Sequence, residues 1–321
     1  MALGEFDLIR NYFQNARLHE GVALGIGDDC ALLTPTPGMH WLVSSDMLVE
    51  GRHFLSTVEP ARLGHKALAV NLSDLAACGA TPRAFTLALA LPRADTAWLE
   101  GFAAGLFALA DQHGIALVGG DTTQGPLNIC ITVMGEAPPG QALLRSGARV
   151  GDDVWVSGAL GDARLALEVF RGALALAGAG FEQARRAMEM PQPRVALGQA
   201  LRGVATSAID VSDGFAGDLG HVLQRSGVGA CVDVDALPCS ALLSSQDIEI
   251  RRLCTLTGGD DYELVFTAPA DALGAVLKAS QIANTAVTRV GRIEAERGLR
   301  LVDGQGGPIR SKLRGFDHFK S

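Results

Sequence analysis

The sequence lacks the features that define several common functional classes. Its six cysteines include no C-x₂-C pair, which argues against a zinc site or a dithiol redox motif. No apolar run approaches the roughly 18 residues needed to cross a bilayer. No run of basic residues offsets the formal net charge of −8, so neither a membrane protein nor a nucleic-acid binder is expected. The N-terminus has no signal-peptide core, which predicts a cytoplasmic protein.

The common nucleotide-binding loops are missing as well. There is no Walker A sequence, G-x-x-x-x-G-K-[ST], and no G-x-G-x-x-G after an apparent strand. Aromatic residues make up 5% of the chain, but hydrophobic residues make up 48% and charged residues 19%, as in an ordinary globular protein. A length of 321 residues favours two domains, each with its own core.

Strand-like and helix-like segments alternate, which predicts an α/β chain of the α+β type with a mixed sheet. Paired prolines and a glycine at Ala137–Gly140 stop both helix and strand, so we place an N-terminal domain at residues 1–140 and a C-terminal α/β domain at 141–321. Asp95 is expected to cap a helix that closes at Gly114. Residues 115–118 are expected to form a strand that Gly119–Thr123 follows, and residues 172–180 a helix of uncertain end.

The sequence does contain a series of five short motifs that each end on an aspartate. They are Gly25–Asp29, Ser44–Asp46, Asn71–Asp74, Gly119–Asp121 and Asp210–Asp213. A carboxylate at the end of a buried strand is costly unless something positive meets it. Two carboxylates about 5 Å apart repel by about 3 kcal/mol at an effective dielectric near 20. If the aspartates converge, Mg²⁺ together with phosphate is the expected partner.

Each motif taken alone also has a structural explanation. Glycine and aspartate are common in solvated turns, which would explain Gly25–Asp29. Ser212 or Asp213 could cap the helix that follows them. Gly158 and Gly161 could form a tight turn, or could present backbone amides to an anion at a helix start.

For three further features, the sequence alone does not decide between a structural and a functional role. Arg145 is either an ordinary surface cation or an anion contact, and His53 is either structural or functional. The acidic segment Gly258–Leu264 precedes an apolar run and is ambiguous in the same way.

Taken in order, these segments resemble the thiamine-monophosphate kinase family, of the aminoimidazole-ribonucleotide-synthetase-like superfamily. The resemblance is carried by Gly4–Phe6, Gly25–Leu32, Lys66–Ala77, Gly119–Thr123, Arg145–Gly147, Ile209–Gly214, Gly258–Leu264 and Gly315–Phe319. It implies a two-domain fold and a homodimer built mainly by the N-terminal domains. It also implies transfer of the γ-phosphoryl group of ATP to thiamine monophosphate, which gives thiamine diphosphate and ADP.

The resemblance implies a role for each matching position. The Mg²⁺ ligands would be Asp29, Ser45, Asp46, Asp74, Asp121, Asp210 and Asp213. The ATP contacts would be Gly120, Arg145 and Ser212, and the substrate contacts would be His53, Asp260 and Phe316. The family usually has glutamate where Asp260 stands, so the reach to substrate is one methylene shorter. Several Mg²⁺ ions would accompany ATP, and no general base is assigned because the attacking phosphate is already anionic.

Two alternatives remain at this point. One is another ATP-dependent enzyme of the superfamily, such as selenophosphate synthetase, which is opposed by the lack of a reactive cysteine in a glycine-rich N-terminal segment. The other is a non-catalytic nucleotide-binding maturation protein, which an assay for thiamine diphosphate would separate from the kinase.

Overall fold

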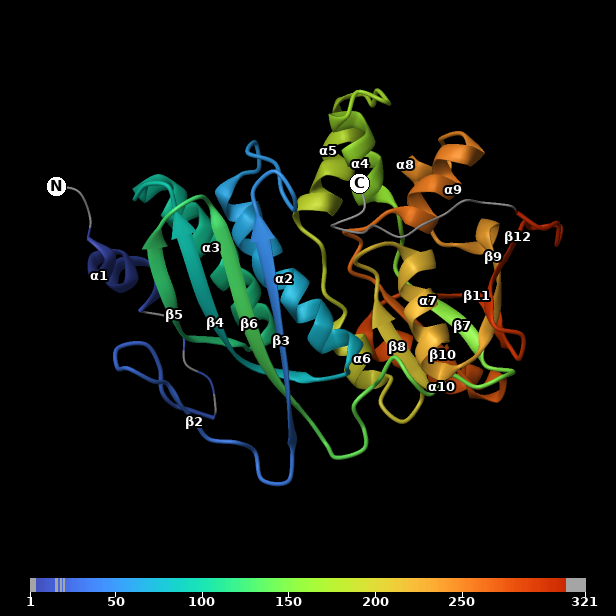
Figure 1. Ribbon diagram of the computed structural model, residues 1–321, viewed down its shortest axis with the longest axis horizontal. Helices are drawn as coiled ribbons and strands as arrows, with labels where there is room; N and C mark the ends of the chain where they lie inside the picture. The colour runs from blue at the N-terminus through green and yellow to red at the C-terminus, as the bar shows by residue number, and fades with distance from the viewer. Residues whose placement is uncertain (1–3, 15–16, 18, 20, 310–321) are drawn as a thin grey trace. The chain divides into compact units, whose positions relative to one another are not determined.

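The protein, in the form of a computed structural model, is described over residues 4–14, 17, 19 and 21–309. The chain divides into two compact units, one of residues 1–75 with 80–140 and one of residues 76–79 with 141–321. We call these the N-terminal unit and the C-terminal unit and describe each by itself (Figure 1). Among the described residues, no helix combines the length and the apolar character needed to cross a membrane.

The N-terminal unit is built on a four-stranded mixed sheet. Its strands are β3 (His40–Val49), β4 (Thr81–Leu91), β5 (Ala116–Gln124) and β6 (Asn128–Ala137), in the order β3-β6-β4-β5. β4 and β5 are parallel, and the other neighbours are antiparallel. Two short strands, β1 (Val22–Leu24) and β2 (Leu32–Leu33), form a separate antiparallel pair.

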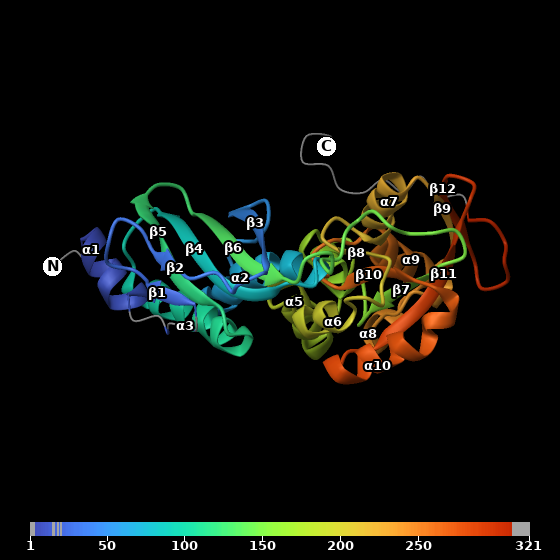
Figure 2. The ribbon, with the colours of Figure 1, turned by 90° about the horizontal axis from the view of Figure 1, so that it is seen from below.

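Helices cover one face of this sheet. The long helices are α2 (Pro60–Ala77) and α3 (Thr96–His113), and Figure 2 shows both on the same side of the sheet. At the N-terminus, α1 (Glu5–Leu8) continues into a π-helix over Ile9–Phe13. The predicted limits of α3 are confirmed, because the Asp95 side chain accepts the Trp98 N–H at 3.1 Å and Gly114 closes the helix in the left-handed conformation.

The C-terminal unit is built on a six-stranded sheet of order β12-β9-β11-β7-β10-β8. Its strands are β7 (Asp153–Ser157), β8 (Ser207–Asp210), β9 (Gly229–Asp233), β10 (Leu264–Ala268), β11 (Val287–Glu294) and β12 (Gly298–Val302). All neighbours are antiparallel except β12 and β9. The mixed sheets of both units confirm the predicted fold class.

Seven α-helices and two 3₁₀ turns accompany the described part of this sheet. The helices are α4 (Asp162–Phe170), α5 (Gly178–Glu189), α6 (Val195–Ala200), α7 (Phe215–Ser226), α8 (Ala241–Ser244), α9 (Ile248–Thr257) and α10 (Leu273–Ala283). The turns are Val234–Ala236 and Ala270–Ala272. The predicted helix over residues 172–180 is wrong for its first part, because α4 ends at Phe170 and α5 begins only at Gly178.

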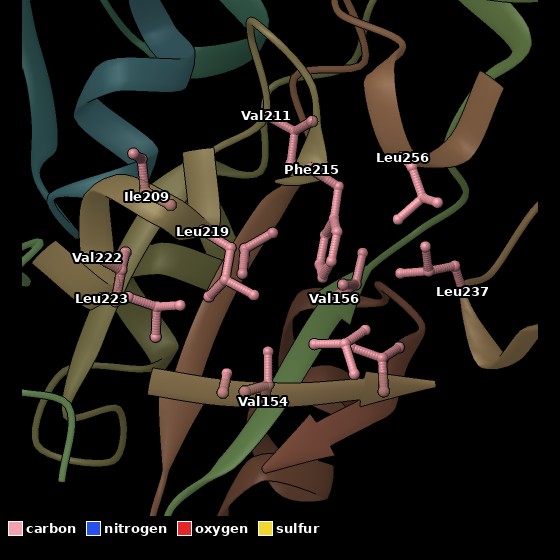
Figure 3. Packing of buried hydrophobic residues seen from close by; sticks show 14 of the residues in the cluster. Val154, Val156, Ile209, Val211, Phe215, Leu219, Val222, Leu223, Leu237 and Leu256 are labelled. Atoms are coloured by element: carbon pink, nitrogen blue, oxygen red, sulfur yellow. The ribbon is translucent and has the colours of Figure 1, made fainter. Parts of the chain in front are cut away.

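The core of the C-terminal unit lies between α7 and the sheet. Phe215, Leu219 and Val222 recur at helical spacing on one face of α7 and are at most 1% exposed. They pack with Val154 and Val156 of β7 (Figure 3). This packing fixes the position of α7, and with it the loop that connects β8 to α7.

Candidate functional site

The N-terminal unit brings two of the aspartate motifs together where β3 passes α2. The Ser44 hydroxyl donates a hydrogen bond to the Asp74 carboxylate. The Asp46 backbone N–H donates to the Asn71 side-chain oxygen at 3.1 Å, and Asn71 is 1% exposed. The motifs of β3 and α2 therefore form one cluster of oxygen donors, to which Ser44 belongs although sequence reasoning assigned it no role.

Ser45 lies on the other face of β3. Successive side chains of a strand point to opposite faces, so Ser44 and Asp46 share a face that Ser45 does not. The Ser45 hydroxyl contacts β6 instead, at 3.1 Å from the Ile131 carbonyl oxygen and 3.0 Å from the Thr132 hydroxyl. The side chains of Ser45 and Asp46 are thus not placed to bind the same ion.

A second group of predicted residues lines a cavity of about 580 Å³ within the N-terminal unit. Asp29, Gly120 and Asp121 line it together with apolar side chains of the N-terminal helix and of β5, namely Ile9, Phe13, Leu117 and Val118. Asp29 and Asp121 are both exposed. A pocket with apolar walls and a few carboxylates suits an organic ligand that carries a cation or a metal-bound anion.

Gly120 has a structural reason to be glycine. A Cβ at this position would lie 1.8 Å from the Leu87 carbonyl oxygen, and its φ of +149° is rarely adopted by other residues. The predicted end of the strand at residue 118 is wrong, since β5 continues through both glycines to Gln124 in parallel pairing with β4. Asp121 therefore lies inside a strand and not at its end.

The sheet separates the two groups by its full width. Pairing runs from Asp46 through Ile131 and Leu87 to Gly120, the neighbour of Asp121. Three strand spacings place the Cα atoms of Asp46 and Asp121 roughly 14 Å apart. With Mg–O bonds of about 2.1 Å, one Mg²⁺ cannot bind both carboxylates.

The side chains present fit Mg²⁺ chemically, although they form no complete cage. Over residues 4–14, 17, 19 and 21–309, no group of three His, Cys, Asp or Glu side chains is arranged to hold a metal. Mg²⁺ prefers oxygen ligands and is usually bound by one or two carboxylates, with substrate phosphates and water completing its coordination. The Asp46–Asp74 cluster and the Asp29–Asp121 cavity each supply such carboxylates.

His53 follows β3 and is held at its Nδ1 atom. Nδ1 accepts the Val49 backbone N–H at 3.0 Å, so the neutral ring carries its proton on Nε2. The buried Lys66 ammonium donates to the His53 carbonyl oxygen at 3.2 Å. The contacts that orient His53 therefore come from β3 and α2, the two elements that carry Asp46 and Asp74.

In the C-terminal unit, the predicted residues gather where β8 leads into α7. Asp210 is the last residue of β8 and is 4% exposed. The next residues form a loop whose amides turn inward, because the backbone N–H groups of Ser212 and Asp213 both donate to Asp218 Oδ2 at 3.1 Å. Asp218, in the first turn of α7, thus sets the conformation of this loop.

The cap of α7 bears on one structural explanation of this motif, in which Ser212 or Asp213 caps the helix. Gly214 is the N-cap residue, and no side chain of Ser212 or Asp213 caps the helix. Burial raises the pKa of Asp218 to about 7, although its bonds from the amides of Asp213 and Ser212 oppose the shift. Sequence reasoning missed Asp218, and the available signal was an acid between Phe215 and Leu219 on the apolar face of α7.

Arg145 lies near the other end of α7. Its backbone carbonyl oxygen accepts the Ser226 hydroxyl at 3.3 Å, and Ser226 is the last residue of the helix. Ser212 precedes the first turn, so the length of α7, about 18 Å for 12 residues, separates the two predicted ATP contacts. Any nucleotide that contacted both residues of one chain would have to extend along the helix.

Asp260 lies in a loop that pairs with the β8–α7 loop. The Asp260 N–H donates to the Ser212 carbonyl oxygen at 3.0 Å, and the Tyr262 N–H donates to the Val211 carbonyl oxygen at 2.8 Å. Asp260, Ser212 and Asp213 are therefore neighbours within the C-terminal unit. Phe316, the third predicted substrate contact, lies outside the described residues.

Two buried carboxylates anchor the Asp260 loop to the rest of the unit. Asp261 accepts the Gly161 N–H at 2.9 and 3.0 Å, and burial raises its pKa well above the usual range. Glu263 accepts the Ser157 hydroxyl and a bidentate pair of bonds from Arg194. The acceptor at the start of α4 is therefore the Asp261 carboxyl group of the protein itself. An external anion at this place was one of the two explanations offered for the glycines before this helix.

Comparison with known proteins places this arrangement in a family. Residues 27–137 match the family described as AIR synthase related protein, N-terminal domain. Residues 149–304 match the family described as AIR synthase related protein, C-terminal domain. Together these matches include every aspartate of the candidate site, whereas Arg145 lies between the two matched ranges.

Relatives extend the match over the whole chain. A thiamine-monophosphate kinase of Salmonella typhimurium is 46% identical over 325 residues, which cover 99% of each chain. The crystal structure of a thiamine-monophosphate kinase from Stenotrophomonas maltophilia is 46% identical, with a TM-score of 0.86 over 96% of this chain and 99% of that one. A structure described as AaThiL complexed with AMPPCP and TMP is 29% identical, with a TM-score of 0.77 over 89% of each chain.

The chain belongs to the AIR synthase related proteins and, within them, to the thiamine-monophosphate kinase family. These findings confirm the resemblance, the two-domain fold and the enzyme class that the sequence predicts.

Proposed function

We propose that this chain transfers the γ-phosphoryl group of ATP to thiamine monophosphate, with Mg²⁺ held by its aspartates, to give thiamine diphosphate and ADP. The observation that carries the proposal is the identity of 46% to a thiamine-monophosphate kinase over 99% of both chains. The complex of AaThiL with AMPPCP and TMP supports ATP and thiamine monophosphate as the two substrates.

The chemistry that the site must perform is the approach of two polyanions. The acceptor is a phosphate that is already ionised at neutral pH, so no side chain has to remove a proton from it. Mg²⁺ would neutralise charge on the phosphates of both substrates and on the transferring group. The proposed ligands are Asp29, Ser45, Asp46, Asp74, Asp121, Asp210 and Asp213, and the distance across the sheet requires more than one ion.

The nucleotide and substrate contacts are proposed in the same way. Gly120 borders the cavity that Asp29 and Asp121 line, which supports a nucleotide contact there. Ser212 lies beside Asp213, whereas Arg145 lies a helix length away and would act as a charge partner for phosphate at a different point. His53 and Asp260 are the proposed substrate contacts among the described residues.

The test is a coupled assay for product. The purified protein, incubated with ATP, Mg²⁺ and thiamine monophosphate, is expected to form equal amounts of ADP and thiamine diphosphate. Nucleotide binding without any thiamine diphosphate would support the alternative of a non-catalytic maturation protein. ATP turnover only with selenide would support the alternative of a selenophosphate synthetase. The predicted homodimer stays a prediction, which light scattering on the same sample would test.

Replacement of single carboxylates tests the site itself. Asp46→Asn and Asp121→Asn should each lower kcat by about two orders of magnitude, because each removes a charge that faces the transferring group through a metal. The matched control is Asp111→Asn, an exposed carboxylate on α3 that lines no part of the site, and it should keep normal activity. Near-normal turnover of either site variant at saturating Mg²⁺ would contradict the proposed metal site.

A further inference from the structure

Along the Asp260–Glu263 segment, alternate side chains have different kinds of partner. Two of them bond to other elements of the unit, and the two between bond to each other. Asp261 and Glu263 point into the unit, where they accept hydrogen bonds from Gly161 and Arg194. Asp260 and Tyr262 occupy the positions between them and contact each other, since the Tyr262 hydroxyl lies 3.0 Å from Asp260 Oδ1 and donates to it. The two kinds of position thus have different partners within one short segment.

Backbone conformation sets these two residues apart from nearly all others. Asp260 has a φ of +65° and Tyr262 a φ of +51°. The only other described non-glycine residue with positive φ is Asn284, which ends α10 in the ordinary way. A left-handed backbone conformation costs free energy at residues other than glycine. It persists where surrounding contacts impose it, most often at functional sites.

The surrounding contacts do impose this conformation. The N–H groups of Asp260 and Tyr262 both pair with the β8–α7 loop. On the other side, the Asp261 carboxylate is fixed by Gly161, while Glu263 lies so close over Gly158 that a Cβ there would be 1.9 Å from it. The strain therefore serves to bring the Tyr262 ring and the Asp260 carboxylate to one side of the loop.

We propose that Tyr262 is a positioning residue that holds the Asp260 carboxylate in the orientation required to bind thiamine monophosphate. The inference rests on the proposed function, in which Asp260 contacts this substrate. A phenol that donates to a carboxylate forms a charge-assisted bond and selects one rotamer of the acid. Tyr262 is 8% exposed, so its ring is itself immobilised by packing and can hold the hydroxyl in place.

The arrangement also bears on the short side chain at this position. Aspartate has one methylene fewer than the usual glutamate, so it has less reach but also fewer rotamers to restrict. A carboxylate fixed in one orientation pays less entropy when it binds an N–H donor or a cation, and thiamine monophosphate carries both. The hydroxyl of Tyr262 would thus act on substrate affinity and not on the chemical step.

The decisive variant is Tyr262→Phe, which keeps the ring and removes only the hydroxyl. We expect a rise of roughly tenfold in KM for thiamine monophosphate, the factor typical of a lost hydrogen bond to a charged group, with kcat and the KM for ATP unchanged. Tyr12 is the only other tyrosine of the chain, so Tyr12→Phe is the matched control and should leave all three constants unchanged.

A double-mutant cycle shows whether Tyr262 acts through Asp260. In an Asp260→Asn background, which loses the charged acceptor, Tyr262→Phe should cause little further change in KM for thiamine monophosphate. If the two effects multiply instead, the hydroxyl does not act through Asp260 and the proposal is overturned.

The remaining outcomes are also decisive. An unchanged KM for thiamine monophosphate in Tyr262→Phe overturns the proposal. An equal change in the KM for thiamine monophosphate and the KM for ATP, together with a lowered melting temperature, indicates a structural role only and also overturns it. Failure of Tyr262→Phe to fold would overturn it for the same reason. Failure of the proposed function is distinguishable, because the unmodified protein would then form no thiamine diphosphate.

Discussion

Replacing Arg194 with methionine removes the cation that pairs with a buried carboxylate, and we expect it to destabilise the C-terminal unit strongly. The Glu263 side chain is 5% exposed and the Arg194 side chain 26%. Arg194 Nε donates to one Glu263 oxygen at 2.7 Å, and Nη2 donates to the other. Two unit charges about 4 Å apart attract by about 4 kcal/mol at an effective dielectric of 20. Breaking a buried pair from one side typically costs about 3–5 kcal/mol, which agrees with this figure.

The difference in exposure predicts an asymmetry between the two partners. Arg194→Met leaves a nearly inaccessible charge on Glu263, whereas Glu263→Gln leaves the guanidinium of Arg194 with some access to water. We therefore expect Glu263→Gln to cost less than Arg194→Met. The double variant should recover part of the lost free energy of unfolding, because it leaves no buried charge without a partner. Arg171→Met is the control, since Arg171 is 52% exposed in its pair with Glu168 and should change stability by at most about 0.5 kcal/mol.

Urea unfolding can be followed in the C-terminal unit alone. Of the three tryptophans, only Trp155 belongs to this unit. It lies in β7 and stacks on Phe266, with the two ring centroids 6.3 Å apart. Its fluorescence in a Trp41→Phe, Trp98→Phe background reports unfolding of this unit. The burial argument would be refuted if Arg194→Met lowered the free energy of unfolding by less than about 1 kcal/mol. It would also be refuted if Glu263→Gln lowered this free energy more than Arg194→Met does.

Two further predictions concern pH and backbone space. The Arg252 guanidinium that donates to Asp235 lowers the pKa of that acid from 3.8 to about 2, so the carboxylate adds about 2 kcal/mol of stability above pH 3.8 that is lost as the pH falls toward 2. Asp235→Asn should flatten this part of the stability profile, measured by urea unfolding, and an unchanged profile would contradict the assignment. Gly120→Ala should cost about 3 kcal/mol or more and displace β5, as seen by hydrogen exchange, because its Cβ would meet a β4 carbonyl at 1.8 Å. Gly274→Ala has open space and should not destabilise.

Local signals in the sequence were sufficient for several elements. Asp95 and Gly114 bound α3 because each satisfies backbone groups within a few residues of itself, so the sequence alone contains the information. The sequence also alternates along β6, and its apolar positions Ile129, Ile131 and Val133 are all buried on one face. Where a preference arises from neighbours along the chain, sequence reasoning succeeds.

Long-range pairing explains what the sequence could not reveal. Gly119 and Gly120 have the composition of a turn, but β4 pairs with them and extends β5 to Gln124. Likewise, Asp261 resembles any acid of an acidic loop, and only the fold brings it to Gly161, 100 residues earlier. The candidate residues could be named from their motifs, but their division between two faces of β3 and two edges of one sheet required the structure.

Some acids of the chain bind backbone amides and others are proposed to bind metal, and this difference explains why Mg²⁺ is expected to be indispensable. A helix N-terminus is a natural phosphate site, yet backbone amides at the starts of α4 and α7 already donate to the carboxyl groups of Asp261 and Asp218. These acids fix the loops that carry the proposed site residues, and in doing so they take up the amides that could have bound phosphate. With a net charge of −8, the chain would repel a triphosphate at long range. Apart from Arg145, the proposed charge partner for phosphate, the attraction would come from cations bound together with the nucleotide. ATP binding itself, and not only turnover, should therefore weaken sharply when Mg²⁺ is removed by a chelator.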